Sequence, residues 1–178
     1  MMGDMSPEGS GTQSLATRLQ PCGPVLEARA AERAREIVAG VTWTPELEQA
    51  WPALAPVFGA SSYLASLARR DPARLAAMLA DDPDARLAAI LARTAEVAAL
   101  TPDAAMAPLR LLKQELHLLT ALCDLGGVWD LDQVTGALTR FADAAVGASL
   151  MCAARGELHA GRLTALGEGE AGPVPGWV

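Results

Sequence analysis

The sequence has few aromatic residues and few β-branched ones. Phe, Trp and Tyr make up 4% of the 178 residues, although hydrophobic residues make up 51%. The apolar residues are mainly Ala and Leu, which are strong helix formers, whereas strands favour β-branched and aromatic side chains. No segment alternates apolar and polar residues in the way that a half-buried strand does. The composition therefore predicts an all-α protein whose core of small side chains lets the helices pack closely.

Positive charge is also scarce, since 14 Lys and Arg stand against 21 Asp and Glu, for a net charge of −7. The chain thus lacks the basic surface that binds phosphate backbones and the basic face of a surface membrane helix. It has no uncharged apolar run of ~18 residues. Its opening residues, MMGDMSPEGSGTQS, do not resemble a secretory signal. We expect no nucleic acid and no membrane among its partners, and a cytoplasmic location.

The sequence contains three cysteines and no familiar catalytic motif. Cys22, Cys123 and Cys152 are odd in number and widely spaced, which favours free thiols in a reducing compartment. Gly-rich phosphate loops, G-K-[ST], G-x-S-x-G and H-E-x-x-H are all missing. The residues themselves therefore indicate no catalytic, cofactor-binding or metal site.

Capping residues and prolines divide the chain. Residues 1–22 are rich in Gly, Ser, Pro and Thr and predict a disordered leader, 23–160 predict a helical domain, and 161–178 read as a Gly/Pro linker. A helix start is indicated wherever a capping residue precedes proline, or where Gln stands three residues after a capping Asp. These starts are Thr44-Pro45, Asp71-Pro72, Asp82-Pro83, Thr101-Pro102 and Asp130 with Gln133.

Helix ends and breaks are predicted in the same way. The first helix is expected over residues 24–39, with Gly40 as its stop, and Pro52 and Pro56 are expected to break the next one. The last helix is expected to reach residues 154–158. The similar segments DPARLAAML and DPDARLAAIL could be a repeat, but two copies are too few for a solenoid. We predict an irregular bundle of about six or seven antiparallel helices.

The segment KQELHLLTALCDLGG concentrates residue types that bind metals or transfer protons, namely Glu115, His117, Cys123 and Asp124. On a helix, two residues of separation correspond to about 200° of rotation, so Glu115 and His117 point to opposite sides. His117 and Cys123, six residues apart, also lie on different faces. Because two ligands on one helix need a spacing of three or four, these residues are not expected to share a metal.

The same segment instead has the pattern of an amphipathic helix. His117 is then a surface or interface residue, and Cys123 a small buried side chain. The predicted polar stripe consists of Arg110, Lys113, His117, Thr120 and Asp124, and the predicted buried stripe of Leu109, Leu112, Leu116, Leu119 and Leu122.

Two Asp-x-Asp pairs also occur, Asp82 with Asp84 and Asp130 with Asp132. Such pairs hold Mg²⁺ in nucleotidyl transfer when they lie on a strand, because alternate strand residues share a face. Here both pairs open helices, where carboxylates cap backbone N–H groups and face the positive end of the helix dipole. We expect them to be structural. His159 stands alone near a helix end.

Two long segments within residues 52–155 stand out by their order, PVFGASSYLASLARRDPARLAAML and PLRLLKQELHLLTALCDLGGVWDLDQVTGALTRFADAAVGASL. In this order they resemble the N-terminal helical region of glutamine synthetase adenylyltransferase. The family's Asp-Leu-x-Gly corresponds to Asp124, Leu125 and Gly127, and its Leu-Ala-Asp-Ala segment to Phe141-Ala142-Asp143-Ala144. The family's basic run is thinned here to Arg110 and Lys113.

The resemblance implies that the chain is a helical fragment of a larger bifunctional enzyme. That enzyme attaches AMP to glutamine synthetase and removes it, uses ATP, Mg²⁺ and phosphate, and answers to a PII signalling protein. A linker like GEGEAGPVPGWV would lead into a nucleotidyltransferase domain that carries the metal-binding aspartates. No cofactor and no catalytic residue are expected within residues 1–178, whose role would be to support that domain or to seat a partner protein.

Two other functions fit the residues. The chain could be a stand-alone helical adaptor or regulator, with no enzymatic parent. It could also be a metal or redox protein that uses Glu115, His117 and Cys123, although their helical spacing argues against it.

Overall fold

A computed structural model describes residues 13–163, and all regular secondary structure in this part of the chain is helical. The all-α prediction is therefore confirmed. Eight α-helices and one 3₁₀ helix are present in the described range, one α-helix more than the upper prediction. They are α1 (Leu15–Arg18), α2 (Ala28–Ala39), α3 (Pro45–Ala60), α4 (Ser62–Arg70), α5 (Pro72–Ala80), α6 (Pro83–Glu96), η1 (Val97–Ala99), α7 (Pro102–Leu125) and α8 (Leu131–His159).

The predicted helix starts are confirmed at the level of side-chain hydrogen bonds. The cap residues accept bonds from backbone N–H groups in the first turns of α3, α5, α6 and α7, and they are Thr44, Asp71, Asp82 and Thr101. At α8, the Asp130 carboxylate accepts from the Gln133 N–H at 2.8 Å, and the Gln133 side chain accepts from the Asp130 N–H at 2.9 Å. The α8 helix ends at His159, one residue beyond the predicted range.

Two predictions about the first helices are wrong. Helix α2 begins at Ala28 and not at residue 24. Pro52 and Pro56 do not break α3, which continues through both. A proline removes one backbone hydrogen bond, but residues 53–59 are buried, and their packing holds the helix in spite of that loss.

The predicted leader over residues 1–22 is also wrong for its last part. Leu15 and Leu19, four residues apart on and after α1, are 0% and 8% exposed. The Leu15 N–H donates to the Asp81 carbonyl at 2.8 Å, and the Gln20 N–H donates to the Gly126 carbonyl at 3.0 Å. The segment is ordered because its apolar side chains enter the core and because carbonyl groups of two turns accept hydrogen bonds from its backbone N–H groups. The rest of the predicted leader, and the linker from residue 164 on, lie outside the described residues.

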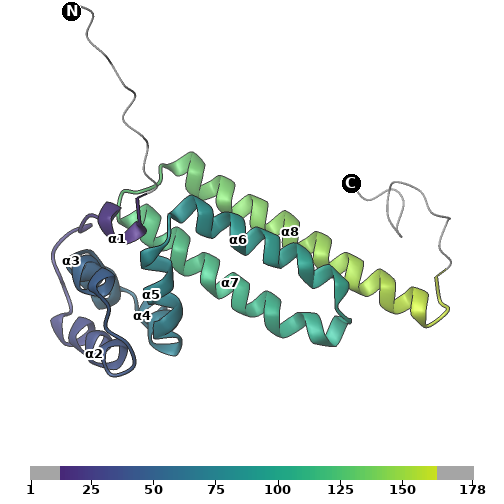
Figure 1. The fold of residues 1–178 in the computed structure, drawn as a ribbon, viewed down its shortest axis with the longest axis horizontal. Coiled ribbons are helices and arrows are strands. Elements are labelled where there is room, and N and C mark those ends of the chain that lie inside the picture. The colour runs from purple at the N-terminus through teal and green to yellow at the C-terminus, as the bar shows by residue number, and fades with distance from the viewer. Residues whose placement is uncertain (1–12, 164–178) are drawn as a thin grey trace, which may run out of the picture.

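Helices α6, α7 and α8 form a long three-helix group, and α1–α5 gather around one end of it (Figure 1). The connection from α6 to α7 lies at one end of this group, and the connection from α7 to α8 lies at the other end. Consistent with this, a Cβ added at Gly156, near the end of α8, would meet Pro102, at the start of α7, at 3.4 Å. The start of α7 and the end of α8 project away from α1–α5 (Figure 1), so the first half of α7 has fewer helices to cover it.

One described helix, α8, is long and apolar enough to cross a membrane by length and composition alone. A core helix in a bundle meets the same two criteria, and α8 packs along α6, η1 and α7.

Truncation of Leu15 tests whether the N-terminal segment is part of the core. Because Leu15 is fully buried, Leu15→Ala is expected to lower the free energy of unfolding by about 2–4 kcal/mol in urea denaturation. The matched control is Gln20→Ala, which changes an exposed side chain and is expected to stay within about 0.5 kcal/mol of the parent. Equal stability of both variants would mean that the segment does not dock.

Candidate functional site

Glu115 on α7 is a buried carboxylate held between two arginines of α6. The residue is 2% exposed. Its Oε1 accepts from Arg86 Nε at 2.8 Å, and its Oε2 accepts from Arg93 Nη1 at 3.1 Å. Arg86 also pairs with Asp81 at 2.8 Å. Both carboxylate oxygens therefore accept a hydrogen bond, and the carboxylate links α7 to α6.

Sequence reasoning missed this arrangement because the partners of Glu115 come from another helix. A signal was present, since Arg86 and Arg93 are seven residues apart and lie two turns apart on one face of α6. Breaking a buried ion pair costs more than forming it gains, because the remaining charge stays buried without its partner.

The other polar residues of that segment point to different surroundings. The Tyr63 hydroxyl, on α4, lies 2.9 Å from His117 Nδ1, and burial, followed by the charge of Lys113, lowers the pKa of His117. Asp124 is exposed. Within residues 13–163, no three His, Cys, Asp or Glu side chains gather in a way that could hold a metal ion.

The two predicted stripes of α7 are largely as expected, with two differences. The predicted buried leucines are buried, except Leu109, which is half-buried. Thr120, predicted on the polar stripe, is 5% exposed, and its hydroxyl donates to the Leu116 carbonyl at 2.8 Å. That internal bond is what lets a hydroxyl enter the core.

The thiols differ in environment. Cys123 is fully buried, and that burial raises the pKa of its thiol far above the ordinary value. Cys152 is also buried and donates to the Val97 carbonyl at 3.1 Å. Cys22 is exposed.

Each of the two Asp-x-Asp pairs lies at the start of a helix. Asp82 Oδ1 accepts from the N–H groups of Asp84 and Ala85, both at 3.0 Å, while Asp84 is exposed. Asp130 belongs to the capping box, and Asp132 is exposed in the first turn of α8. Each pair thus has one carboxylate that caps a helix and one that faces solvent. His159 is the exposed last residue of α8.

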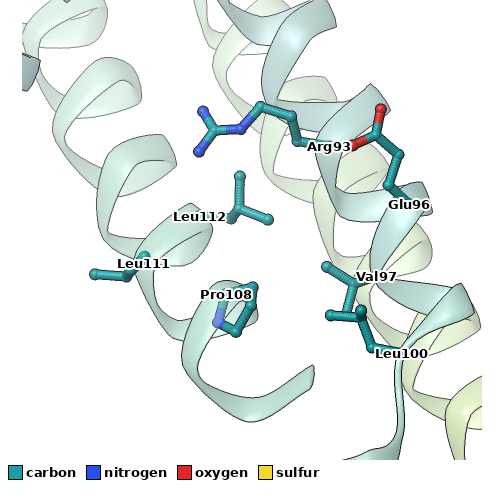
Figure 2. Close-up of a pocket in the computed structure, with 7 residues that line it drawn as sticks. All are labelled: Arg93, Glu96, Val97, Leu100, Pro108, Leu111 and Leu112. Carbon is teal, nitrogen blue, oxygen red and sulfur yellow. The ribbon is translucent and has the colours of Figure 1, made fainter. Parts of the chain in front are cut away.

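A groove of about 360 Å³ lies between the end of α6, η1 and the first half of α7. Figure 2 shows the Arg93 guanidinium reaching from α6 toward α7 above Leu112, with Val97 and Leu100 facing Pro108 across the groove. Arg93 is paired with Glu115, and Glu96 is the other charged lining residue; the remaining lining residues are apolar. The lining residues are Arg93, Glu96, Val97, Leu100, Pro108, Leu111 and Leu112.

The groove continues into exposed apolar surface. Leu100 is 38% exposed and Leu111 54%, and Met106, further round α7, is 59% exposed. Apolar side chains exposed beside a groove are typical of surfaces that contact protein. The arrangement fits an apolar side chain from another segment.

Removal of the Glu115 charge tests its structural role. Glu115→Gln is expected to lower the free energy of unfolding by about 3 kcal/mol, because two arginines lose a buried counter-charge. Glu96→Gln, an exposed acid on the same groove, is the matched control and is expected to cost less than about 0.5 kcal/mol. Similar small effects in urea denaturation of both variants would contradict the role assigned to Glu115.

Thiol labelling tests the assignment of the cysteines. In the native protein, a maleimide is expected to react rapidly with one thiol, Cys22, because Cys123 and Cys152 are buried. In denaturant all three are expected to react. Mass spectrometry of the labelled peptides gives the site, and equally fast native labelling of Cys123 would show that it is an accessible thiol.

Comparison with known proteins places this helical fold in a family. The family model described as glutamate-ammonia ligase adenylyltransferase matches residues 51–174. A "bifunctional glutamine synthetase adenylyltransferase/adenylyl-removing enzyme" of Caulobacter vibrioides is 57% identical over 171 residues, covering 94% of this chain. Proteins of the same name from Bradyrhizobium diazoefficiens and Rhodopseudomonas palustris are 39% and 43% identical, covering 85% and 75% of the chain. No solved structure matches.

The chain spans only a small share of these relatives. It covers 17% of the Caulobacter protein, 16% of the Bradyrhizobium protein and 13% of the Rhodopseudomonas protein. The matched range includes the groove and the ion pairs of Glu115 that link α6 and α7. The chain therefore belongs to the glutamate-ammonia ligase adenylyltransferase family.

Proposed function

We propose that this chain is the non-catalytic helical region of a longer bifunctional enzyme that attaches AMP to glutamine synthetase and removes it. The observation that carries the proposal is the combination of 57% identity with a coverage of only 17% of that relative. The described helices use their polar groups in caps and ion pairs, which fits a region that supports chemistry located elsewhere in the polypeptide.

The expected chemistry of the longer enzyme follows from the family. ATP and Mg²⁺ would bind in a nucleotidyltransferase domain outside residues 1–178, and the enzyme would work in the cytoplasm. Glutamine synthetase and a PII signalling protein are its expected partners. The region described here would support that domain and help to seat one of these proteins.

The groove between α6, η1 and α7 supports the proposed role. Its apolar lining and the exposed Leu111 would be covered when the remaining polypeptide packs against α6 and α7. Burial of one leucine side chain contributes about 1.5–3 kcal/mol, so such a contact would couple the stability of the two parts.

A stand-alone adaptor is the second candidate, because the same groove could receive an apolar side chain of a separate protein. The genomic sequence after the codon for Val178 separates the two. An open frame that encodes a Gly-Ser turn and paired aspartates on a strand supports the enzyme, whereas an immediate stop codon supports the adaptor.

Substitution of Leu111 tests the support role in the longer protein. Leu111→Glu is expected to lower its free energy of unfolding by about 2 kcal/mol, while changing that of residues 1–178 alone by less than about 0.5 kcal/mol, because Leu111 is 54% exposed there. The matched control is Arg110→Glu, at the neighbouring exposed position on α7. AMP attachment to glutamine synthetase is measured in parallel. Equal effects of Leu111→Glu in the short and long proteins would argue against burial of the groove.

A further inference from the structure

Helix α8 has an exposed face that carries no charge. Seven positions spaced by four, three, four, four, three and four residues fall along one side of the helix, and they extend over most of its length. They are Leu131, Thr135, Leu138, Ala142, Val146, Ser149 and Ala153, and all seven are exposed. We call this set the α8 face.

Large apolar side chains make up part of the α8 face. Leu131 is 74% exposed, Val146 69% and Leu138 40%. The charged residues of this part of α8, Asp132, Arg140 and Asp143, lie on the next sector of the helix. The side that packs inward is a third one and contains the buried Val134, Ala137, Phe141, Ala148 and Cys152. An uncharged exposed sector between a packed one and a charged one indicates a second packing surface.

The α8 face continues onto α7. A second groove, of about 250 Å³, lies between these helices. Its lining includes Ser149 of the α8 face, Met106 and Leu109 of α7, and one charged residue, Asp103, in the first turn of α7. Met106 is 59% exposed. The groove lies at the end of α7 and α8 that projects away from α1–α5 in Figure 1. The apolar surface therefore crosses two helices where α1–α5 do not reach.

The length of the relatives indicates what covers this surface. The chain accounts for 17% of the Caulobacter protein, and the family match continues to residue 174, past the end of α8. The polypeptide thus leaves α8 at its C-terminal end, beside the second groove. A segment tethered there has a high effective concentration at the α8 face, which no separate partner has.

We propose that a helix from the remaining part of the longer polypeptide packs lengthwise on the α8 face and fills the groove beside Met106. The proposal rests on the proposed function, since it needs that longer polypeptide. Ala142, Ser149 and Ala153 let a helix approach to roughly 8 Å, so its contacting side is expected to be uncharged and rich in small and apolar residues. A second copy of this chain is the competing occupant.

Thiol labelling in a Cys22→Ser background, followed on the peptide that carries the new cysteine by mass spectrometry, tests the proposal, because Cys123 and Cys152 are buried. Val146→Cys places one thiol on the α8 face, and Asp143→Cys, on the charged sector, is the matched control. Maleimide labelling rates are measured for residues 1–178 and for the longer protein. Val146→Cys is expected to react at least tenfold more slowly in the longer protein, whereas Asp143→Cys is expected to react at rates within twofold of each other in the two.

The other outcomes overturn the proposal. Equal rates for Val146→Cys in both proteins would show that nothing covers the α8 face. Protection already present in residues 1–178, and rising with protein concentration, would identify a second copy as the occupant. Assays of AMP attachment to glutamine synthetase and of its removal, made on the longer protein, distinguish failure of the α8 contact from failure of the proposed function. An active longer protein with a freely labelled Val146→Cys defeats only the α8 contact, whereas an inactive one defeats the proposed function.

Discussion

The position of α6 on α7 depends on one buried carboxylate. One carboxylate oxygen of Glu115 accepts a hydrogen bond from Arg86 and the other accepts one from Arg93. These arginines lie two turns apart on α6. If α6 slid along α7 by one turn, at least one of these bonds would be lost, and a buried charge would remain without its partner. The ion-pair cluster therefore fixes the register of the two helices, and the rest of the three-helix group is built on that register.

The groove follows from the same register. With Arg93 held over α7, Val97 and Leu100 come to lie opposite Pro108, and Cys152 of α8 meets the Val97 carbonyl. The groove is therefore a mainly apolar surface that lies beside the ion-pair cluster of Arg86, Glu115 and Arg93.

The secondary structure could be predicted where a single residue decides it. Caps such as Asp82 and the Asp130–Gln133 pair act within one turn, so their effect is visible in the sequence. The local pattern does not predict the structure at Pro56 and Leu15, because it depends there on burial against distant helices. Tertiary packing can override both a proline inside a helix and a Gly/Ser-rich composition.

The divergence of Glu115 and His117 could be predicted from the sequence, whereas the partners of Glu115 could not. Helical spacing separates Glu115 from His117, and the structure places them against different neighbours. Predicting the partners of Glu115 requires knowledge of which helices lie side by side, and so does predicting both grooves.

The N-terminal segment has a consequence for how the sequence can vary. Because its backbone bridges the turns at Asp81 and Gly126, selection is expected to preserve its length between those anchors, so that insertions and deletions there are rarer than substitutions of its exposed side chains.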